Sequence, residues 1–112
     1  MDCLFCRIAC GEIPSNEVYS DDKVYAFYDI NPQAPVHVLV IPKSHIESCD
    51  KIDDSNSDVL KDIFEAIPKI AHKLGLENGY RVVSNVGEDG CQSVKHMHFH
   101  ILGGKKLSEA MS

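Results

Sequence analysis

The sequence predicts an α+β domain: a five-stranded, mainly antiparallel sheet with one long helix and a short helix near the N-terminus. Five short stretches are rich in β-branched and aromatic residues, whereas only one long stretch repeats its apolar residues every three or four positions. A chain of 112 residues is long enough for one domain and one core. We therefore expect residues 1–112 to form a single domain, with its core at about 3–104 and a loose polar tail at 105–112.

The first half of the chain provides the short helix and three strands. Residues 3–11 have the apolar spacing of a short helical segment that ends at Gly11. Residues 17–20 and 24–30 read as strands, and a loop with two prolines follows. Residues 36–42 are almost wholly apolar, which predicts a strand in the centre of the sheet.

The second half contains the long helix and the last two strands. From residue 59 to residue 74 the apolar positions follow helical spacing, and Gly75 ends the pattern. Pro68 lies inside this helix and is expected to kink it or to begin a new first turn. On the same helix, His72 is expected on the surface. Residues 79–85 form the fourth predicted strand, and a glycine-bearing loop leads from it to the fifth.

The fifth strand contains three of the six histidines of the chain. His96, His98 and His100 alternate with apolar residues, and this segment ends at Gly103 and Gly104. Because successive side chains of a strand point to opposite faces, a strand would place three imidazoles on one face and the apolar residues against a core. On a helix the same rings would be spread around the axis, so we expect a strand.

Three interpretations of this histidine row remain open from the residues alone. Imidazole can act as a nucleophile, a general acid or base, or a metal ligand near neutral pH. The row therefore indicates nucleophilic transfer of a group such as phosphoryl, or a His-x-His metal site. The third interpretation is that the histidines merely fit the strand. His37 is the one polar side chain of the central strand and would need a partner if buried.

A Cys-x-x-Cys pair suggests how metal binding and catalysis could be divided. Cys3 and Cys6 are half of a tetrahedral zinc site, although redox chemistry or plain packing explains such a pair about as often. His45 and His96 both lie near predicted strand ends, where the N-terminal helix could complete a Cys2His2 set. His98 and His100 would then remain free for chemistry. The other cysteines are expected to be structural or incidental: Cys10, Cys49 and Cys91.

Composition argues against several partners. The net charge is −6 and there is no basic run, so nucleic acid is not an expected partner. No apolar stretch approaches ~20 residues, so no membrane association is expected. The N-terminus lacks the pattern of a signal peptide, and an odd count of five cysteines suits a reducing compartment. We therefore expect a cytoplasmic protein.

These residues resemble the histidine triad (HIT) family, whose signature alternates three histidines with apolar residues and ends in two apolar residues; here it spans residues 96–102. Further stretches resemble the Hint branch of that family, over about residues 3–104: 11–14, 29–37, 39–46 and 92–96. The fold implied is HIT-like. The resemblance also implies a homodimer in which the main helices and the fourth strands pair, so that two sheets merge into one of ten strands.

The resemblance implies hydrolysis or transfer at the α-phosphorus of purine nucleoside 5′-phosphoramidates, such as an AMP amide or AMP-lysine. His98 would be the nucleophile that forms a nucleotidyl-histidine. His100 and His37 would polarise the phosphate oxygens and hold the tautomer of the nucleophile. Ser93 would hydrogen-bond the phosphate or the leaving group, and the main-chain amides of residues 90–93 suit the developing charge.

For ligands, the resemblance implies one structural zinc per chain, on Cys3, Cys6, His45 and His96, and no organic cofactor. The remaining substrate contacts that it implies comprise a ribose-binding carboxylate, an apolar slot for the base and polar contacts near the phosphate: Asp29, Phe5, Ile8, Phe27, Ile30, Asn85 and Gln92. For each apolar member, plain core packing is an equally good explanation.

Two departures and several alternatives accompany this resemblance. Cys91 stands where eukaryotic members carry glycine, which argues against close backbone approach to the phosphate at that position. The tail lacks their aromatic- and proline-containing ending, so leaving-group preference is not readable. A dinucleoside polyphosphate hydrolase, a nucleotide-binding regulatory module with vestigial turnover and a metal-storage protein are the alternative functions.

Overall fold

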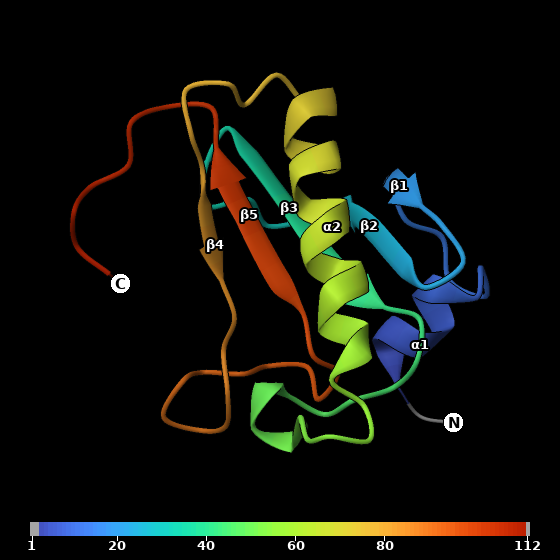
Figure 1. Ribbon diagram of the computed structural model, residues 1–112. Helices are drawn as coiled ribbons and strands as arrows, with labels where there is room; N and C mark the ends of the chain where they lie inside the picture. Colours follow the sequence, from blue (N-terminus) through green and yellow to red (C-terminus); the bar gives the residue numbers. More distant parts are fainter. Residues whose placement is uncertain (1–2, 112) are drawn as a thin grey trace.

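Five antiparallel strands form one sheet in the computed structural model, which describes residues 3–111 (Figure 1). The strands are β1 (Glu17–Ser20), β2 (Val24–Tyr28), β3 (Val36–Pro42), β4 (Arg81–Val83) and β5 (Phe99–Gly103). Their order in the sheet is β1-β2-β3-β5-β4, so the apolar strand β3 is central, as predicted. The outermost residues of the predicted domain and tail, 1–2 and 112, lie outside the described part.

Three strands are shorter than the sequence predicted. β2 ends at Tyr28 rather than at residue 30, because the Asp29 carboxylate accepts a hydrogen bond from the amide of Asn31 and turns the chain. β4 covers 81–83 instead of 79–85, and β5 begins only at Phe99. β4 ends and β5 begins at the point where the Ser84 hydroxyl, instead of a main-chain amide, donates to the carbonyl of His98.

The sheet has a different apolar cluster on each face. Along β3, Val38 and Val40 face one cluster, whereas Leu39 and Ile41 face the other. The alternation continues through the histidine segment, because the three apolar side chains between and after its histidines belong to the first cluster: Met97, Phe99 and Ile101. The imidazoles therefore lie on the face of the second cluster.

Helix α2 (Asp58–Lys73) packs its apolar side on the first face of the sheet, and Figure 1 shows it lying in front of β3. Its buried positions recur at helical spacing: Ile63, Ala66, Ile67, Ile70 and Ala71. Pro68 lies inside one unbroken helix, so the predicted restart did not occur. His72 is exposed, as predicted.

The second face is covered by α1 (Leu4–Ala9), whose Phe5 and Ile8 are buried against β2 and β3. A 3-10 turn, η1 (Cys49–Lys51), lies between β3 and α2. Among the described residues, no helix combines the length and the apolar character that crossing a membrane requires.

Candidate active site and metal centre

The three histidines of the triad do not all lie within a strand. His100 is in β5, whereas His96 and His98 precede it, so the prediction of one continuous strand was wrong there. The Met97 amide donates to the carbonyl of Ile46, 2.6 Å away, which keeps this segment extended without a sheet partner. The ring centroids of His98 and His100 are 5.2 Å apart, so these two imidazoles remain adjacent.

A main-chain carbonyl fixes the tautomer of His98. Its Nδ1 lies 2.7 Å from the carbonyl oxygen of His96. Because a carbonyl only accepts, Nδ1 must carry the proton and donate, and the neutral ring then has its lone pair on Nε2. His98 is 5% exposed and lines two cavities. Its bare nitrogen is the arrangement that a nucleophile requires.

A main-chain amide fixes the tautomers of His37 and His100 in the same way. The Gln33 amide donates to Nδ1 of His37 over 3.0 Å, so the proton of a neutral His37 lies on Nε2. That Nε2–H donates to Nδ1 of His100, 2.8 Å away. The remaining proton of His100 is then on its Nε2, and His100 acts as a hydrogen-bond donor.

Asp29, His37 and His100 also form a cluster whose ligand atoms lie within 4.8 Å of one another. The Asp29 carboxylate is 3.4 Å from Nε2 of His37. A metal at this point would have to displace the proton that the Gln33 amide keeps on that nitrogen. The cluster is therefore better suited to a hydrogen-bond relay than to a metal ion.

Burial keeps these rings neutral. Burial lowers the pKa of His98 below its usual 6.5, opposed by the hydrogen bond to His96 and by the charge of Asp29. Burial also lowers the pKa of His37, and it lowers that of His100 to about 4 with the help of its two histidine neighbours. At neutral pH the site therefore contains uncharged imidazoles, and an uncharged ring has the free lone pair that a nucleophile or a metal ligand needs.

Two cavities meet at the histidines. The first, which we call the apolar cavity, has a volume of about 620 Å³ and is lined by α1, by residues 13–16 and by the end of β2, among others. The second, the histidine cavity, has a volume of about 580 Å³ and extends past His37 and Asn85. Four residues line both: Asp29, Ser93, His98 and His100. A ligand spanning the two would therefore lie against His98.

Most of the predicted substrate contacts line these cavities. Phe5, Ile8 and Phe27 are buried in the wall of the apolar cavity, and Ile30 lies on its rim with 98% of its surface exposed. The Asn85 side chain lines the histidine cavity and donates to the carbonyl of Gly90, so it also braces the loop before the triad.

Gln92 does not face either cavity, contrary to its predicted role as a substrate contact. Its Oε1 accepts from the amide of Gly87, and its Nε2 donates to the carbonyls of Glu47 and Val94. Only 7% of the residue is exposed. Its carboxamide is therefore a brace for the loop, with every strong hydrogen-bonding atom engaged by main chain.

The amides of this loop are also less available than predicted. The Cys91 amide donates to the carbonyl of Glu88, and the Gln92 amide donates to that of Gly87. These two donors close turns inside the loop and cannot also bind a phosphate oxygen. Cys91 has a φ of +56°, a backbone conformation that favours glycine, and its exposed side chain lines the histidine cavity.

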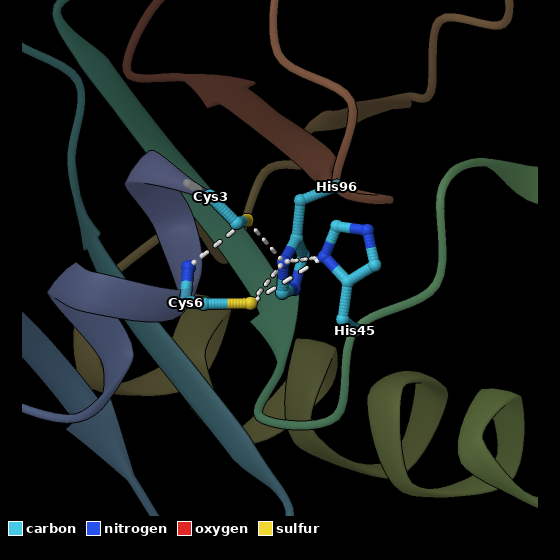
Figure 2. A group of neighbouring side chains, drawn as sticks. All are labelled: Cys3, Cys6, His45 and His96. Atoms are coloured by element: carbon cyan, nitrogen blue, oxygen red, sulfur yellow. Dashed lines mark hydrogen bonds between the residues drawn. The ribbon is translucent and has the colours of Figure 1, made fainter. Parts of the chain in front are cut away.

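The predicted metal ligands Cys3, Cys6, His45 and His96 converge at one point (Figure 2). Nδ1 of His96 lies 3.2 Å from Sγ of Cys3 and 3.4 Å from Sγ of Cys6. Nδ1 of His45 lies 3.4 Å from Sγ of Cys6 and 3.3 Å from Nδ1 of His96. Bond lengths of ~2.0–2.3 Å place neighbouring ligand atoms on a tetrahedral zinc roughly 3.3–3.8 Å apart.

The protonation of the four side chains is also compatible with zinc binding. Nε2 of His96 donates to the carbonyl of Pro42 over 2.8 Å, which leaves the Nδ1 lone pair directed at the cluster. In the metal-free chain, burial and the neighbouring Cys3 raise the pKa of the Cys6 thiol to about 11. Metal binding would therefore release protons from the thiols. Two thiolates and two imidazoles form a standard structural zinc set.

Several groups that organise the site could not be identified from residue types. Ser84 holds the carbonyl of His98, and the amide of Gln33 and the carbonyl of Pro42 hold ring nitrogens. Two of these three are main-chain groups, which every residue possesses. For Ser84 the only signal was its position near the end of a predicted strand.

Comparison with known proteins agrees with this geometry. The profile of the HIT domain matches residues 10–107. The chain is 46% identical over 107 residues to a 14 kDa zinc-binding protein of Zea mays, covering 94% of this chain and 84% of that one. It is 42% identical over 107 residues to the adenylylsulfatase HINT1 of Arabidopsis thaliana, covering 94% and 73%.

Solved structures resemble it over almost their whole length. A histidine triad protein from Clostridium difficile superposes with a TM-score of 0.95 at 53% identity, covering 98% of this chain and 96% of that one. A HIT family hydrolase from Legionella pneumophila gives 0.95 at 46% identity, covering 99% and 100%. The chain therefore belongs to the histidine triad family. The names of its zinc-binding and HINT1 relatives support its placement in the Hint-like branch.

The buried histidines should make folding stability depend on pH. The unfolded chain binds protons on His37 and His100 near pH 6.5, whereas the folded protein binds them only at lower pH. Stability should therefore fall as the pH is lowered from 6.5 towards 4. Melting temperatures across this range should drop by several degrees, and the slope should be shallower in His100→Asn. His72→Asn is the exposed control; equal slopes in all three proteins would contradict this assignment.

The amide of Gln33 should control the tautomer of His37. Gln33→Ala keeps the N–H and should leave turnover unchanged, whereas Gln33→Pro removes it and should lower kcat by about ten-fold, the value of one lost hydrogen bond. Nitrogen-15 NMR of the imidazoles reads the tautomer directly. A wild-type His37 protonated on Nδ1 would refute this arrangement, whatever the effect of the proline.

Proposed function

We propose that the protein hydrolyses purine nucleoside 5′-phosphoramidates at the α-phosphorus through a nucleotidyl-histidine intermediate on His98. The observation that carries this proposal is the bare Nε2 of a buried, neutral His98 at the junction of two cavities. A HIT family hydrolase among the similar structures supports a hydrolytic reaction. A histidine triad nucleotide-binding protein of Candida albicans supports a nucleotide as ligand.

In this mechanism the Nε2 lone pair of His98 forms a bond to phosphorus while the bond from phosphorus to nitrogen breaks. The departing nitrogen takes up a proton from solvent, so that it leaves as a neutral amine. Nε2–H of His100 donates to a phosphate oxygen, and the relay from His37 keeps that donor in place. The hydroxyl of Ser93 lies beside both cavities and can hydrogen-bond the phosphate or the leaving amine. Water then attacks phosphorus and releases a proton to solvent while the bond from phosphorus to Nε2 breaks, which returns His98 to its neutral form.

The nucleoside would occupy the apolar cavity. Phe5, Ile8 and Phe27 provide an apolar wall for the base, and Asp29 and His98 line the same cavity. A carboxylate can accept hydrogen bonds from two adjacent ribose hydroxyls while Oδ1 also accepts from the Asn31 amide. With the base and ribose in these positions, the 5′-phosphate reaches the histidine cavity.

A structural zinc on Cys3, Cys6, His45 and His96, one per chain, is part of this proposal. Its support is the convergence of the four donors and the zinc-binding name of a relative. When bound, the ion would join α1 to the segments that follow β3 and precede β5. The free cysteine thiols in the described residues suit the reducing cytoplasm that we propose as the location.

We also propose that two copies pair through α2 and β4. β4 is an edge strand of the described sheet, which leaves one side of it without a strand partner. Phe64 of α2 and Val82 of β4 are large apolar residues with 51% and 37% of their surfaces exposed. Pairing of two such edges would cover both residues and extend the sheet.

The leading test is release of AMP from adenosine 5′-phosphoramidate by the purified protein. His98→Ala should lose at least ~10³-fold in kcat, because it removes the atom that attacks phosphorus. His72→Ala, on the exposed side of α2, should keep the wild-type rate. Mass spectrometry of the quenched reaction should find the nucleotidyl group on His98. A fully active His98→Ala protein would end this mechanism.

The same assay separates the alternative substrates. A dinucleoside polyphosphate and adenylyl sulfate, the latter suggested by the adenylylsulfatase relative, carry the same adenosine 5′-phosphate with different leaving groups. The highest kcat/KM among the three identifies the leaving group that the site accepts. Nucleotide binding that persists in His98→Ala without turnover of any wild-type substrate would favour the regulatory module.

Metal analysis tests the zinc assignment. The wild-type protein should contain one zinc per chain, and Cys3→Ala should lose it because one thiolate is removed from the ligand set. His98→Ala should keep it, since that ring belongs to the other site. A protein that loses its zinc in His98→Ala would instead support a metal-storage role for the triad.

A further inference from the structure

We propose that the metal centre and the nucleotide site are thermodynamically coupled through α1, with Cys3 and Cys6 acting as positioning residues for the wall that holds the base. This inference rests on the proposed function, because it requires zinc at the cluster and a nucleotide in the apolar cavity. It goes further in predicting that occupancy of one site changes the affinity of the other.

Helix α1 contributes to both sites within six residues. Cys6, together with Cys3 at the helix N-cap, provides half of the metal ligands. Leu4, Phe5 and Ile8 line the apolar cavity. A helix of six residues is too short to persist by itself, so its position depends on the contacts of these few side chains. A bound metal would fix one side of α1 and thereby fix the cavity wall on the other.

Phe5 makes the physical connection. Its ring packs edge-on against Phe27 of the cavity wall, with centroids 5.5 Å apart. The centroid of the same ring lies 6.1 Å from the ring centroid of His96, a proposed metal ligand, and 5.1 Å from that of His98. A shift of α1 that followed loss of the metal would therefore move an aromatic ring of the base wall.

The nucleophile, by contrast, is anchored by hydrogen bonds that need no metal. His98 donates to the carbonyl of His96, and His96 donates to the carbonyl of Pro42. The amide of Met97 donates to the carbonyl of Ile46. Removing the metal should therefore loosen the base wall more than it disturbs His98. We expect a change in nucleotide affinity and KM, with little change in kcat.

Thermodynamic linkage makes this proposal measurable without turnover. If zinc raises the affinity for a nucleotide by some factor, the nucleotide must raise the affinity for zinc by the same factor. We expect a factor of roughly ten, within the usual range for coupled sites. A purely structural ion whose removal left the cavity unchanged would give a factor of one.

The test measures both directions with AMP as the nucleotide. Calorimetry gives the Kd of AMP for zinc-loaded protein and for protein dialysed against a chelator, and competition with a chromophoric chelator gives the zinc affinity with and without saturating AMP. Both measurements should change by the same roughly ten-fold factor. The circular dichroism of the chelated protein should remain that of a folded α+β protein.

Matched variants separate ligation from packing. Cys6→Ser should raise KM about ten-fold with little change in kcat. Cys10→Ser, in the exposed C-cap of the same helix, should behave as wild type in every measurement.

Equal AMP affinity with and without zinc would overturn the coupling and leave the proposed hydrolase intact. Zinc-loaded protein that does not bind AMP would overturn both. Global unfolding of the chelated protein would overturn coupling through α1, because the loss of affinity would then belong to the whole fold.

Discussion

Hydrogen bonds between main-chain groups and imidazoles are the interaction on which the site depends. A neutral histidine has one donor and one acceptor nitrogen, and the group bound to one nitrogen determines the role of the other. The carbonyls of Pro42 and His96 accept from one nitrogen of His96 and of His98 and leave a lone pair on the other, whereas an amide that donates to His37 makes His100 a donor. Chemically identical side chains thus present a lone pair at two positions and an N–H at a third.

Much of this arrangement was readable from the sequence. The alternation of histidines with apolar residues predicted the two faces of the segment, because one set had to reach the core. Helical spacing predicted α2 to within one residue, and the apolar run at 36–42 predicted the central strand. The spacing of Cys3 and Cys6 predicted a metal site completed by His45 and His96, and the structure brings these four side chains together.

The rest depended on information that residue types do not contain. The strand predicted from His96 begins only at Phe99, where the Ser84 hydroxyl takes the place of a main-chain donor to the carbonyl of His98, and no sequence pattern predicts this hydrogen bond. Gln92 was assigned to the substrate from resemblance alone, whereas the fold uses its carboxamide to tie three main-chain groups together. Tautomers depend on which backbone group faces each ring, and this is a property of tertiary structure.

The strict alternation between residues 96 and 101 also limits how this protein can evolve. Met97, Phe99 and Ile101 belong to the core beneath α2, while the imidazoles lie on the opposite side of the sheet. Deleting or inserting a single residue here would exchange the two sides, burying imidazoles among aliphatic groups and exposing the core. Related proteins can therefore differ by substitutions along this segment, whereas insertions and deletions within it would not be tolerated.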